Sequence, residues 1–212
     1  MSVINAVILC DGTPPKKQLL ENALAGADLF IAADGGGNIA RKYNLVPDLV
    51  IGDLDSFQQE DESSFEIKKI PGQETNDLEK ALREAKSRNS QHVIVFGSTG
   101  KRVDHTLKNF SVLKQFHHQF QSILFRDNYT DAYLIDSPFK KSFEIGTQIS
   151  LFPLSGKVTG VVTKGLKYPL HAEPLENGVR DGSSNEVTQS IVEIHYKKGD
   201  LLLFEIHNHT HS

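Results

Sequence analysis

The pattern of apolar runs divides the chain into two halves of different texture. In the first half, near-continuous apolar runs at residues 3–9, 28–33, 49–51 and 92–96 alternate with longer polar or amphipathic stretches. Short runs rich in β-branched residues and bounded by turn formers are typical of strands buried on both faces of a parallel sheet. Repeated strand, loop and helix in this order predicts an α/β unit with a mainly parallel sheet.

Helices are predicted for this half at residues 17–25, at residues 39–43 and from Asp77 onward. A further one is predicted in the amphipathic stretch that follows residue 105 and ends at about residue 120. The helix that begins at Asp77 is the best defined, because its apolar residues recur at helical spacing and Thr75 or Asn76 can cap it. The acidic stretch 57–66 is predicted to be a further surface helix.

Short alternating segments characterise the second half, and Asn, Asp, Gly and Pro turns separate them every ten or so residues. They lie at residues 122–125, 131–135, 148–152, 157–162, 190–195 and 201–206. Such spacing predicts an all-β domain, a sandwich. We therefore expect an α/β domain at 1–125 followed without a long linker by a β-sandwich domain at 126–212.

Composition narrows the class of protein. The net charge of −4 and pI near 6.1 argue against sequence-independent nucleic-acid binding, which needs a basic face. No apolar run reaches the roughly 18 residues that a membrane span needs, and the first residues lack the basic start of a secretory signal. The single cysteine, Cys10, excludes a disulfide framework and suits a reducing, cytoplasmic location.

Two carboxylates follow the apolar run 49–51, at Asp53 and Asp55. If the chain stays extended through Leu54, both side chains point the same way, because side chains alternate along a strand. Carboxylates about 4 Å apart repel unless a cation lies between them, and Mg²⁺ is a suitable cation. A solvated acidic turn would show the same two residues, so the pair alone is not decisive.

Other strand ends carry residues suited to a nucleotide. Three glycines follow Asp34 and would let backbone amides approach a ligand, and the loop 98–105 places Lys101 and Arg102 where an anion could bind. Asp77 lies in the first turn of its helix, where it also complements the helix dipole. Ordinary turns and caps explain each feature equally well, and neither the P-loop nor the G-x-G-x-x-G spacing is present.

Taken together, these motifs resemble the thiamine pyrophosphokinase (thiamine diphosphokinase) family. The four segments are Asp34-Gly35-Gly36, Gly52 to Ser56, Gln73 to Asp77 and Gly100 to His105, in this order. The resemblance implies transfer of pyrophosphate from ATP to the hydroxyl of thiamine, giving thiamine diphosphate and AMP. It also implies a homodimer whose cleft lies between subunits, the α/β half of one facing the β half of the other.

The resemblance also implies roles for individual residues. Catalytic residues would be Asp53, Asp55, Asp77 and Gln73, and the three aspartates would bind Mg²⁺. ATP would be bound by Asp34, Gly35, Gly36, Lys101, Arg102 and Asp104.

Two turns predicted in the second half look like the thiamine-binding segments of this family. They are Gly165 to Leu170 and Gly182 to Glu186, and they would supply Tyr168, Ser183, Ser184 and Asn185. Hydroxyl and amide groups can hold a heteroaromatic amine while an aromatic ring stacks on it. The resemblance thus makes 1–125 the ATP- and Mg²⁺-binding catalytic domain and 126–212 the thiamine-binding and dimerisation domain.

Two alternatives to the kinase reading remain open. The same carboxylates could serve a metal-dependent nucleotide phosphohydrolase, or the chain could be a nucleotide or thiamine sensor without catalysis. The histidine-rich tail, residues 207–212, is expected to be a frayed end rather than a metal site.

Overall fold

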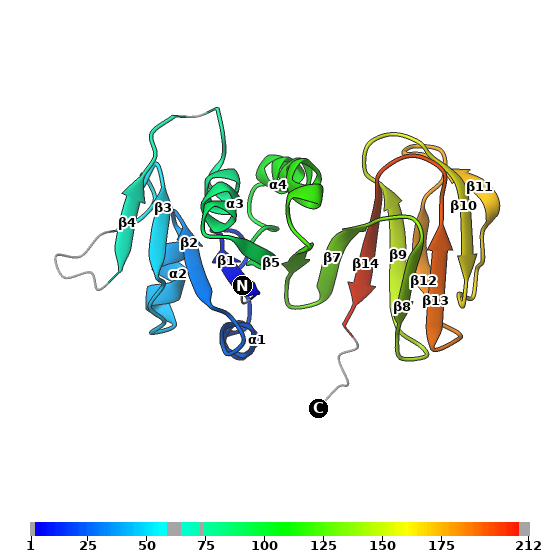
Figure 1. The fold of residues 1–212 in the computed structure, drawn as a ribbon, viewed down its shortest axis with the longest axis horizontal. Helices are drawn as coiled ribbons and strands as arrows, with labels where there is room; N and C mark the ends of the chain where they lie inside the picture. The colour runs from blue at the N-terminus through cyan, green and yellow to red at the C-terminus, as the bar shows by residue number, and fades with distance from the viewer. Residues whose placement is uncertain (1–2, 59–64, 73, 208–212) are drawn as a thin grey trace. The chain divides into compact units, whose positions relative to one another are not determined.

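The computed structural model describes residues 3–58, 65–72 and 74–207, which form two compact units, residues 1–128 and 129–212 (Figure 1). Within the described part of the chain, no helix has the length and apolar character needed to cross a membrane.

Six parallel strands form the sheet of the first unit, in the order β6-β5-β1-β2-β3-β4. They are β1 (Ile4–Leu9), β2 (Leu29–Ala33), β3 (Leu49–Gly52), β4 (Glu66–Lys69), β5 (Ser90–Phe96) and β6 (Ser122–Arg126). The predicted parallel α/β unit is confirmed. Residues 122–125 have the alternating pattern of the second half but precede the expected boundary at 125, and as part of β6 they pair in parallel with β5 and belong to this sheet.

Helices cover both faces of this sheet (Figure 1). They are α1 (Lys17–Leu24), α2 (Gly36–Lys42), α3 (Asp77–Ser87) and α4 (Val103–Phe116), and the short 3-10 helix η1 (His117–Gln119) follows α4. Leu20 of α1 and Ile39 of α2 share a buried core with Val7 and Leu9 of β1. The start of α3 is where the sequence predicts it, because Asn76 Oδ1 accepts a hydrogen bond of 3.0 Å from Glu79 N.

The helix predicted over 57–66 is wrong at both of its described ends. Phe57, Gln58 and Phe65 are not helical, residues 59–64 lie outside the described part, and Glu66 opens β4. This strand is a largely exposed, charged edge strand, so it lacks the apolar pattern by which strands are recognised. Its parallel pairing with β3 is made by backbone hydrogen bonds, and the pattern of side chains in the sequence does not reveal this pairing.

The second unit is a sandwich of two antiparallel sheets, as predicted. One sheet has the order β12-β9-β14-β7 and the other β11-β10-β13-β8. Their bounds are β7 (Thr130–Ile135), β8 (Phe139–Ser142), β9 (Gln148–Pro153), β10 (Val158–Lys164), β11 (His171–Leu175), β12 (Gly182–Glu186), β13 (Ile191–His195) and β14 (Leu201–Ile206). Ile149 and Leu203 of one sheet pack in one core with Val161 and Ile194 of the other.

Candidate active site

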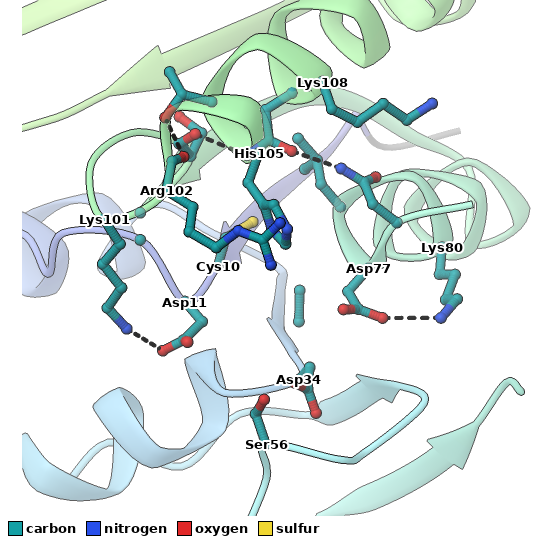
Figure 2. Close-up of a pocket in the computed structure, with 18 of the residues that line it drawn as sticks. Cys10, Asp11, Asp34, Ser56, Asp77, Lys80, Lys101, Arg102, His105 and Lys108 are labelled. Carbon is teal, nitrogen blue, oxygen red and sulfur yellow. Dashed lines mark hydrogen bonds and ion pairs between the residues drawn. The ribbon is translucent and has the colours of Figure 1, made fainter. Parts of the chain in front are cut away.

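A cavity of about 790 Å³ opens at the carboxyl edge of the parallel sheet, within the first unit (Figure 2). Residues that follow β1, β2, β3 and β5 line it, together with residues at the starts of α3 and α4. Ligands of open α/β sheets bind at this edge, and the volume is in the range of small-molecule sites. The lining includes six carboxylates (Asp11, Asp34, Asp53, Asp55, Glu74 and Asp77) and four cations (Lys80, Lys101, Arg102 and Lys108).

Three of these carboxylates converge on one point. Asp34 follows β2, Asp53 follows β3 and Asp77 is the first residue of α3, and one oxygen from each lies within 4.8 Å of the other two. Asp34 is only 6% exposed, and its buried Oδ1 has no hydrogen-bond partner within the described residues. Because a buried, unpartnered carboxylate oxygen is costly, this donor set fits a hard divalent cation such as Mg²⁺.

The surroundings of Asp34 favour its neutral form in the absence of such a cation. Burial raises the pKa of the Asp34 carboxyl above its ordinary value, and the nearby charge of Asp77 raises it further. Hydrogen bonds with Ser56 and the Gly35 backbone lower this pKa in part. A divalent ion between the carboxylates would favour the ionised form and so reverse the shift.

Gly52, the last residue of β3, makes the close approach of these carboxylates possible. A Cβ atom at this position would lie 2.9 Å from Asp34 Cβ and 3.0 Å from Asp77 Oδ1. Both distances are shorter than ordinary van der Waals contact, so any other residue would push the two aspartates apart.

Asp55 does not extend the strand in the way that the sequence predicts. Leu54 has φ of 61°, in the left-handed region, so the chain turns after Asp53 and the expectation of an extended Leu54 is wrong. Asp55 is exposed at the cavity, where its Oδ1 accepts a hydrogen bond of 3.0 Å from Ser56 Oγ. Asp34, rather than Asp55, completes the cluster with Asp53 and Asp77.

The basic loop after β5 brings two cations to the cavity. Lys101 Nζ lies 2.8 Å from Asp11 Oδ1, and Lys101 itself has φ of 52°. Arg102 holds Asp104 through two hydrogen bonds, of 3.1 Å from Nε and 2.5 Å from Nη2. This contact lowers the pKa of Asp104 to about 2. Lys101 and Arg102 are among the lining residues, and Asp104 is not.

The glycines after Asp34 serve packing inside the unit. A Cβ on Gly35 would lie 2.6 Å from Asp11 Cγ, and one on Gly36 would lie 2.0 Å from the Leu9 carbonyl oxygen. Neither glycine is among the residues that line the cavity. Their assignment to ATP stays a prediction, and the observed contacts explain them without a ligand.

Gln73 lies outside the described residues, and the segment that follows it reaches the cavity. Glu74, Thr75 and Asn76 are lining residues. Asn76 caps α3 and also donates a hydrogen bond of 2.7 Å from Nδ2 to Asn109 Oδ1.

Several lining residues have no role in the sequence interpretation. They are Cys10, Asp11, Lys80, His105, Thr106, Lys108 and Asn109. Two of them have a recognisable signal: Asp11 follows a strand as Asp34 and Asp53 do, and Lys80 stands three residues after Asp77, on the same face of α3. Of the others, Cys10 directly follows β1, and His105, Thr106, Lys108 and Asn109 lie on α4.

The residues predicted to bind thiamine lie in the second unit, where Tyr168 and Asn185 meet. Asn185 is 6% exposed, and its Oδ1 accepts a hydrogen bond of 3.1 Å from Tyr168 N while its Nδ2 donates one of 2.8 Å to Tyr168 O. Tyr168 as a whole is 62% exposed. Asn185 therefore fixes the backbone of a turn that presents an aromatic ring.

The two serines lie on a strand and not in the predicted turn, because residues 182–186 form β12 at the edge of its sheet. Ser183 Oγ donates to Asp181, and Ser184 N donates to Ser150 Oγ at 3.1 Å. Ser184 has φ of 55°, and the pairing of β12 with β9 shifts register between Gly182 and Asn185. This irregularity explains why the segment has the composition of a turn.

Comparison with known proteins gives two matches to family models. The thiamin pyrophosphokinase catalytic domain matches residues 20–125, and the thiamin pyrophosphokinase vitamin B1 binding domain matches residues 137–201. The chain belongs to the thiamin pyrophosphokinase family. The resemblance drawn from the four motifs is thereby confirmed.

Individual proteins and solved structures of the thiamin pyrophosphokinase family are also similar to this chain. Thiamin pyrophosphokinase 1 of Caenorhabditis elegans is 29% identical over 200 residues, covering 88% of this chain and 82% of its own. Thiamine pyrophosphokinase of Bacillus subtilis (strain 168) is 26% identical over 184 residues, covering 82% and 86%. The fold matches the Candida albicans enzyme with a TM-score of 0.86 at 16% identity (97% and 90% covered). It matches the Geobacillus thermodenitrificans enzyme with a TM-score of 0.83 at 20% identity (98% and 99% covered).

Proposed function

We propose that this protein transfers the pyrophosphoryl group of ATP to the hydroxyl of thiamine, giving thiamine diphosphate and AMP. The observation that carries the proposal is the cluster of Asp34, Asp53 and Asp77 in a cavity that also holds Lys101 and Arg102. Carboxylates that can bind a divalent cation, beside cations that can bind phosphate, are what a Mg²⁺-nucleotide needs. The match to both family domains supports the identity of the acceptor.

Asp53 and Asp77 are proposed to hold Mg²⁺ together with Asp34, whose unpartnered Oδ1 supports this role. Asp55, which is exposed at the cavity and outside the cluster, is proposed to contribute through the waters of the ion. When bound, Mg²⁺ neutralises phosphate charge and orients the oxygens of the triphosphate. The rigid elements behind the three aspartates, two strand ends and one helix start, keep their oxygens in place before substrate arrives.

Lys101 and Arg102 are proposed to bind the triphosphate from the other side of the cavity. Lys101 forms an ion pair with Asp11, and Arg102 forms one with Asp104. Arg102 donates two of its N–H groups to Asp104. Because a guanidinium has five donors, three remain for phosphate oxygens. Transfer of a pyrophosphoryl group requires attack at the β-phosphorus with departure of AMP, and its catalysis depends on positioning and on stabilising charge on the oxygens. We propose that Gln73 contacts the transferring group.

On the thiamine side, Tyr168 is proposed to stack on the substrate, Asn185 to fix the backbone of its turn, and Ser183 and Ser184 to offer hydrogen bonds to thiamine from β12. The exposed ring of Tyr168 and its fixed backbone support this role. An aromatic face also attracts the cationic thiazolium ring. We propose residues 1–125 as the ATP- and Mg²⁺-binding domain and 126–212 as the thiamine-binding and dimerisation domain.

A homodimer in the cytoplasm is proposed as the working form. The two sets of substrate residues lie in different units of the chain, and a dimer would let one copy supply each set. A dilution series that compares specific activity with the sedimentation coefficient tests this: activity should fall as dimer dissociates. Full activity of sedimentation-pure monomer would refute it.

Incubation with ATP and Mg²⁺, with and without thiamine, tests the reaction itself. Chromatography should show thiamine diphosphate and AMP in equal amounts, and only when thiamine is present. Phosphate release without thiamine would instead indicate a phosphohydrolase, and binding without turnover would indicate a sensor.

A further inference from the structure

Lys80 is a buried lysine at the edge of the carboxylate cluster. It lies one turn after Asp77 on α3, it lines the cavity, and its side chain is only 3% exposed. Its Nζ lies 2.9 Å from Asp77 Oδ1, the contact drawn in Figure 2. Lysine is rarely buried to this degree without a partner of opposite charge.

The hydrogen bonds of Lys80 show what fixes its position. An ammonium group has three donors. Within the described residues, the Lys80 ammonium donates to Asp77 Oδ1. An apolar side chain of similar length would fill the same space without the cost of burying a charge. The position of Lys80 is therefore explained by the charge of the cluster rather than by packing.

The charges within the cluster also explain why a cation lies beside it. Asp34, Asp53 and Asp77 each place a carboxylate oxygen within 4.8 Å of the others, and Lys80 is the cation that forms an ion pair with this cluster among the described residues. The ammonium would therefore stabilise the cluster when no metal is bound. It would also repel a divalent ion that binds the same carboxylates.

We infer that Lys80 is a positioning residue and the resident counter-ion of the metal site. It holds Oδ1 of Asp77 in place, it stabilises the cluster without metal, and it weakens binding of a divalent ion so that the ion exchanges readily with its nucleotide complex. This inference rests on the proposed function, because it assumes that the three aspartates bind a divalent ion.

The test measures metal affinity and stability rather than turnover alone. Mn²⁺ binding to the full chain, followed by the loss of the free-ion signal in electron paramagnetic resonance, gives the dissociation constant. Lys80→Met should bind Mn²⁺ at least about tenfold more tightly than wild type, because a repelling charge has been removed. Its melting temperature in EDTA should fall below that of wild type, and saturating Mn²⁺ should restore most of the loss.

Lys68→Met is the matched control. Lys68 also pairs with a mostly buried carboxylate, at 2.8 Å from Glu84 Oε2, and it does not line the cavity. Its loss should lower the melting temperature equally with and without Mn²⁺ and should leave the dissociation constant unchanged. The comparison separates a counter-ion of the metal site from an ordinary ion pair.

A double variant distinguishes the loss of the Lys80–Asp77 ion pair from a general failure to fold. Asp77→Asn leaves the buried ammonium without its carboxylate, whereas Asp77→Asn with Lys80→Met removes both partners. The double variant should therefore melt at a higher temperature than Asp77→Asn alone. A lower or equal melting temperature would show that Lys80 has another role.

The outcomes are distinguishable. Unchanged or weaker Mn²⁺ binding by Lys80→Met, or a stability loss that Mn²⁺ does not reverse, overturns the inference while wild-type turnover leaves the proposed function intact. Failure of the wild-type protein to bind Mn²⁺ overturns both this inference and the proposed metal site.

Discussion

Asn76 Nδ2 donates a hydrogen bond of 2.7 Å to Asn109 Oδ1, and this bond joins the start of α3 to the middle of α4. Asn109 Nδ2 in turn donates one of 2.7 Å to the carbonyl of Ser98, in the loop after β5. Since Asn76 also caps α3, a chain of three contacts sets the position of Asp77 relative to the basic loop.

Asn109→Ala should destabilise the protein. Asn109 is 9% exposed, and its removal leaves Asn76 Nδ2 and the Ser98 carbonyl without their partner, which costs about 1–3 kcal/mol. Urea unfolding followed by circular dichroism measures the change. Asn22→Ala, which removes the acceptor of an exposed contact with Gln18, should stay within about 0.5 kcal/mol of wild type. Equal effects of the two substitutions would contradict this account.

Asp53→Asn and Asp55→Asn should differ in effect although the residues stand two apart. Asp53 is one of the three clustered carboxylates and Asp55 is not. We expect kcat/KM to fall by at least about 10²-fold for Asp53→Asn, since a charge that binds the metal is lost, and by less for Asp55→Asn. Steady-state kinetics at saturating Mg²⁺ measures both, and circular dichroism checks that both variants fold. The metal assignment is wrong should Asp53→Asn keep near-normal rates.

The sequence does not predict this difference, because the motifs assign both Asp53 and Asp55 to the metal and Asp34 to ATP. Strand ends identify Asp34 and Asp53, and a helix cap identifies Asp77, because the carboxyl ends of parallel strands must meet at one edge. The turn at Leu54 has no signal, since leucine rarely adopts a positive φ, and it removes Asp55 from the cluster.

The remaining misses have a similar cause. An edge strand such as β4 needs no apolar alternation, so its residues Glu66–Lys69 give no pattern to recognise. The pairing of Lys80 with Asp77 depends on the burial of one face of α3, and helical spacing shows only that the two could meet. Gly35 and Gly36 are a different case: their assignment to ATP stays a prediction, and their close packing against Asp11 and Leu9 is a second role that the sequence does not show.

Gly52→Ala should weaken metal binding without unfolding the sheet. The added Cβ would meet Asp34 Cβ at 2.9 Å and Asp77 Oδ1 at 3.0 Å, so both aspartates must shift. Overpacking of about 1–3 kcal/mol corresponds to a Mn²⁺ dissociation constant about 5–160-fold higher. Gly26→Ala is the control, because its Cβ would meet no atom of the described residues within 4 Å. Titration with Mn²⁺ should separate the two variants, and identical affinities would show that Gly52 does not control the cluster.

Glu84 should contribute to the loss of stability in acid. Burial raises the pKa of its carboxyl, but hydrogen bonds from Lys68 and Arg88 outweigh burial, so the pKa lies below its ordinary value of 4.5. A carboxyl with a lowered folded-state pKa stabilises the protein above its unfolded-state pKa, and this contribution disappears as pH falls through the folded-state value. Unfolding by urea at a series of pH values should therefore show a flatter acid limb for Glu84→Gln than for wild type. Parallel curves for the two proteins would contradict the assignment.

Tyr168→Ala should raise KM for thiamine while leaving KM for ATP unchanged. Loss of an aromatic contact worth about 0.5–1.5 kcal/mol corresponds to a rise of roughly 2–10-fold, and Tyr168→Phe, which keeps the ring, should stay near wild type. Tyr129→Ala is the matched control, because Tyr129 is equally exposed at 62% in the same unit. Initial rates with each substrate varied in turn give both constants. An unchanged KM for thiamine in Tyr168→Ala would exclude stacking by this ring, and an equal rise in Tyr129→Ala would attribute the effect to the unit as a whole.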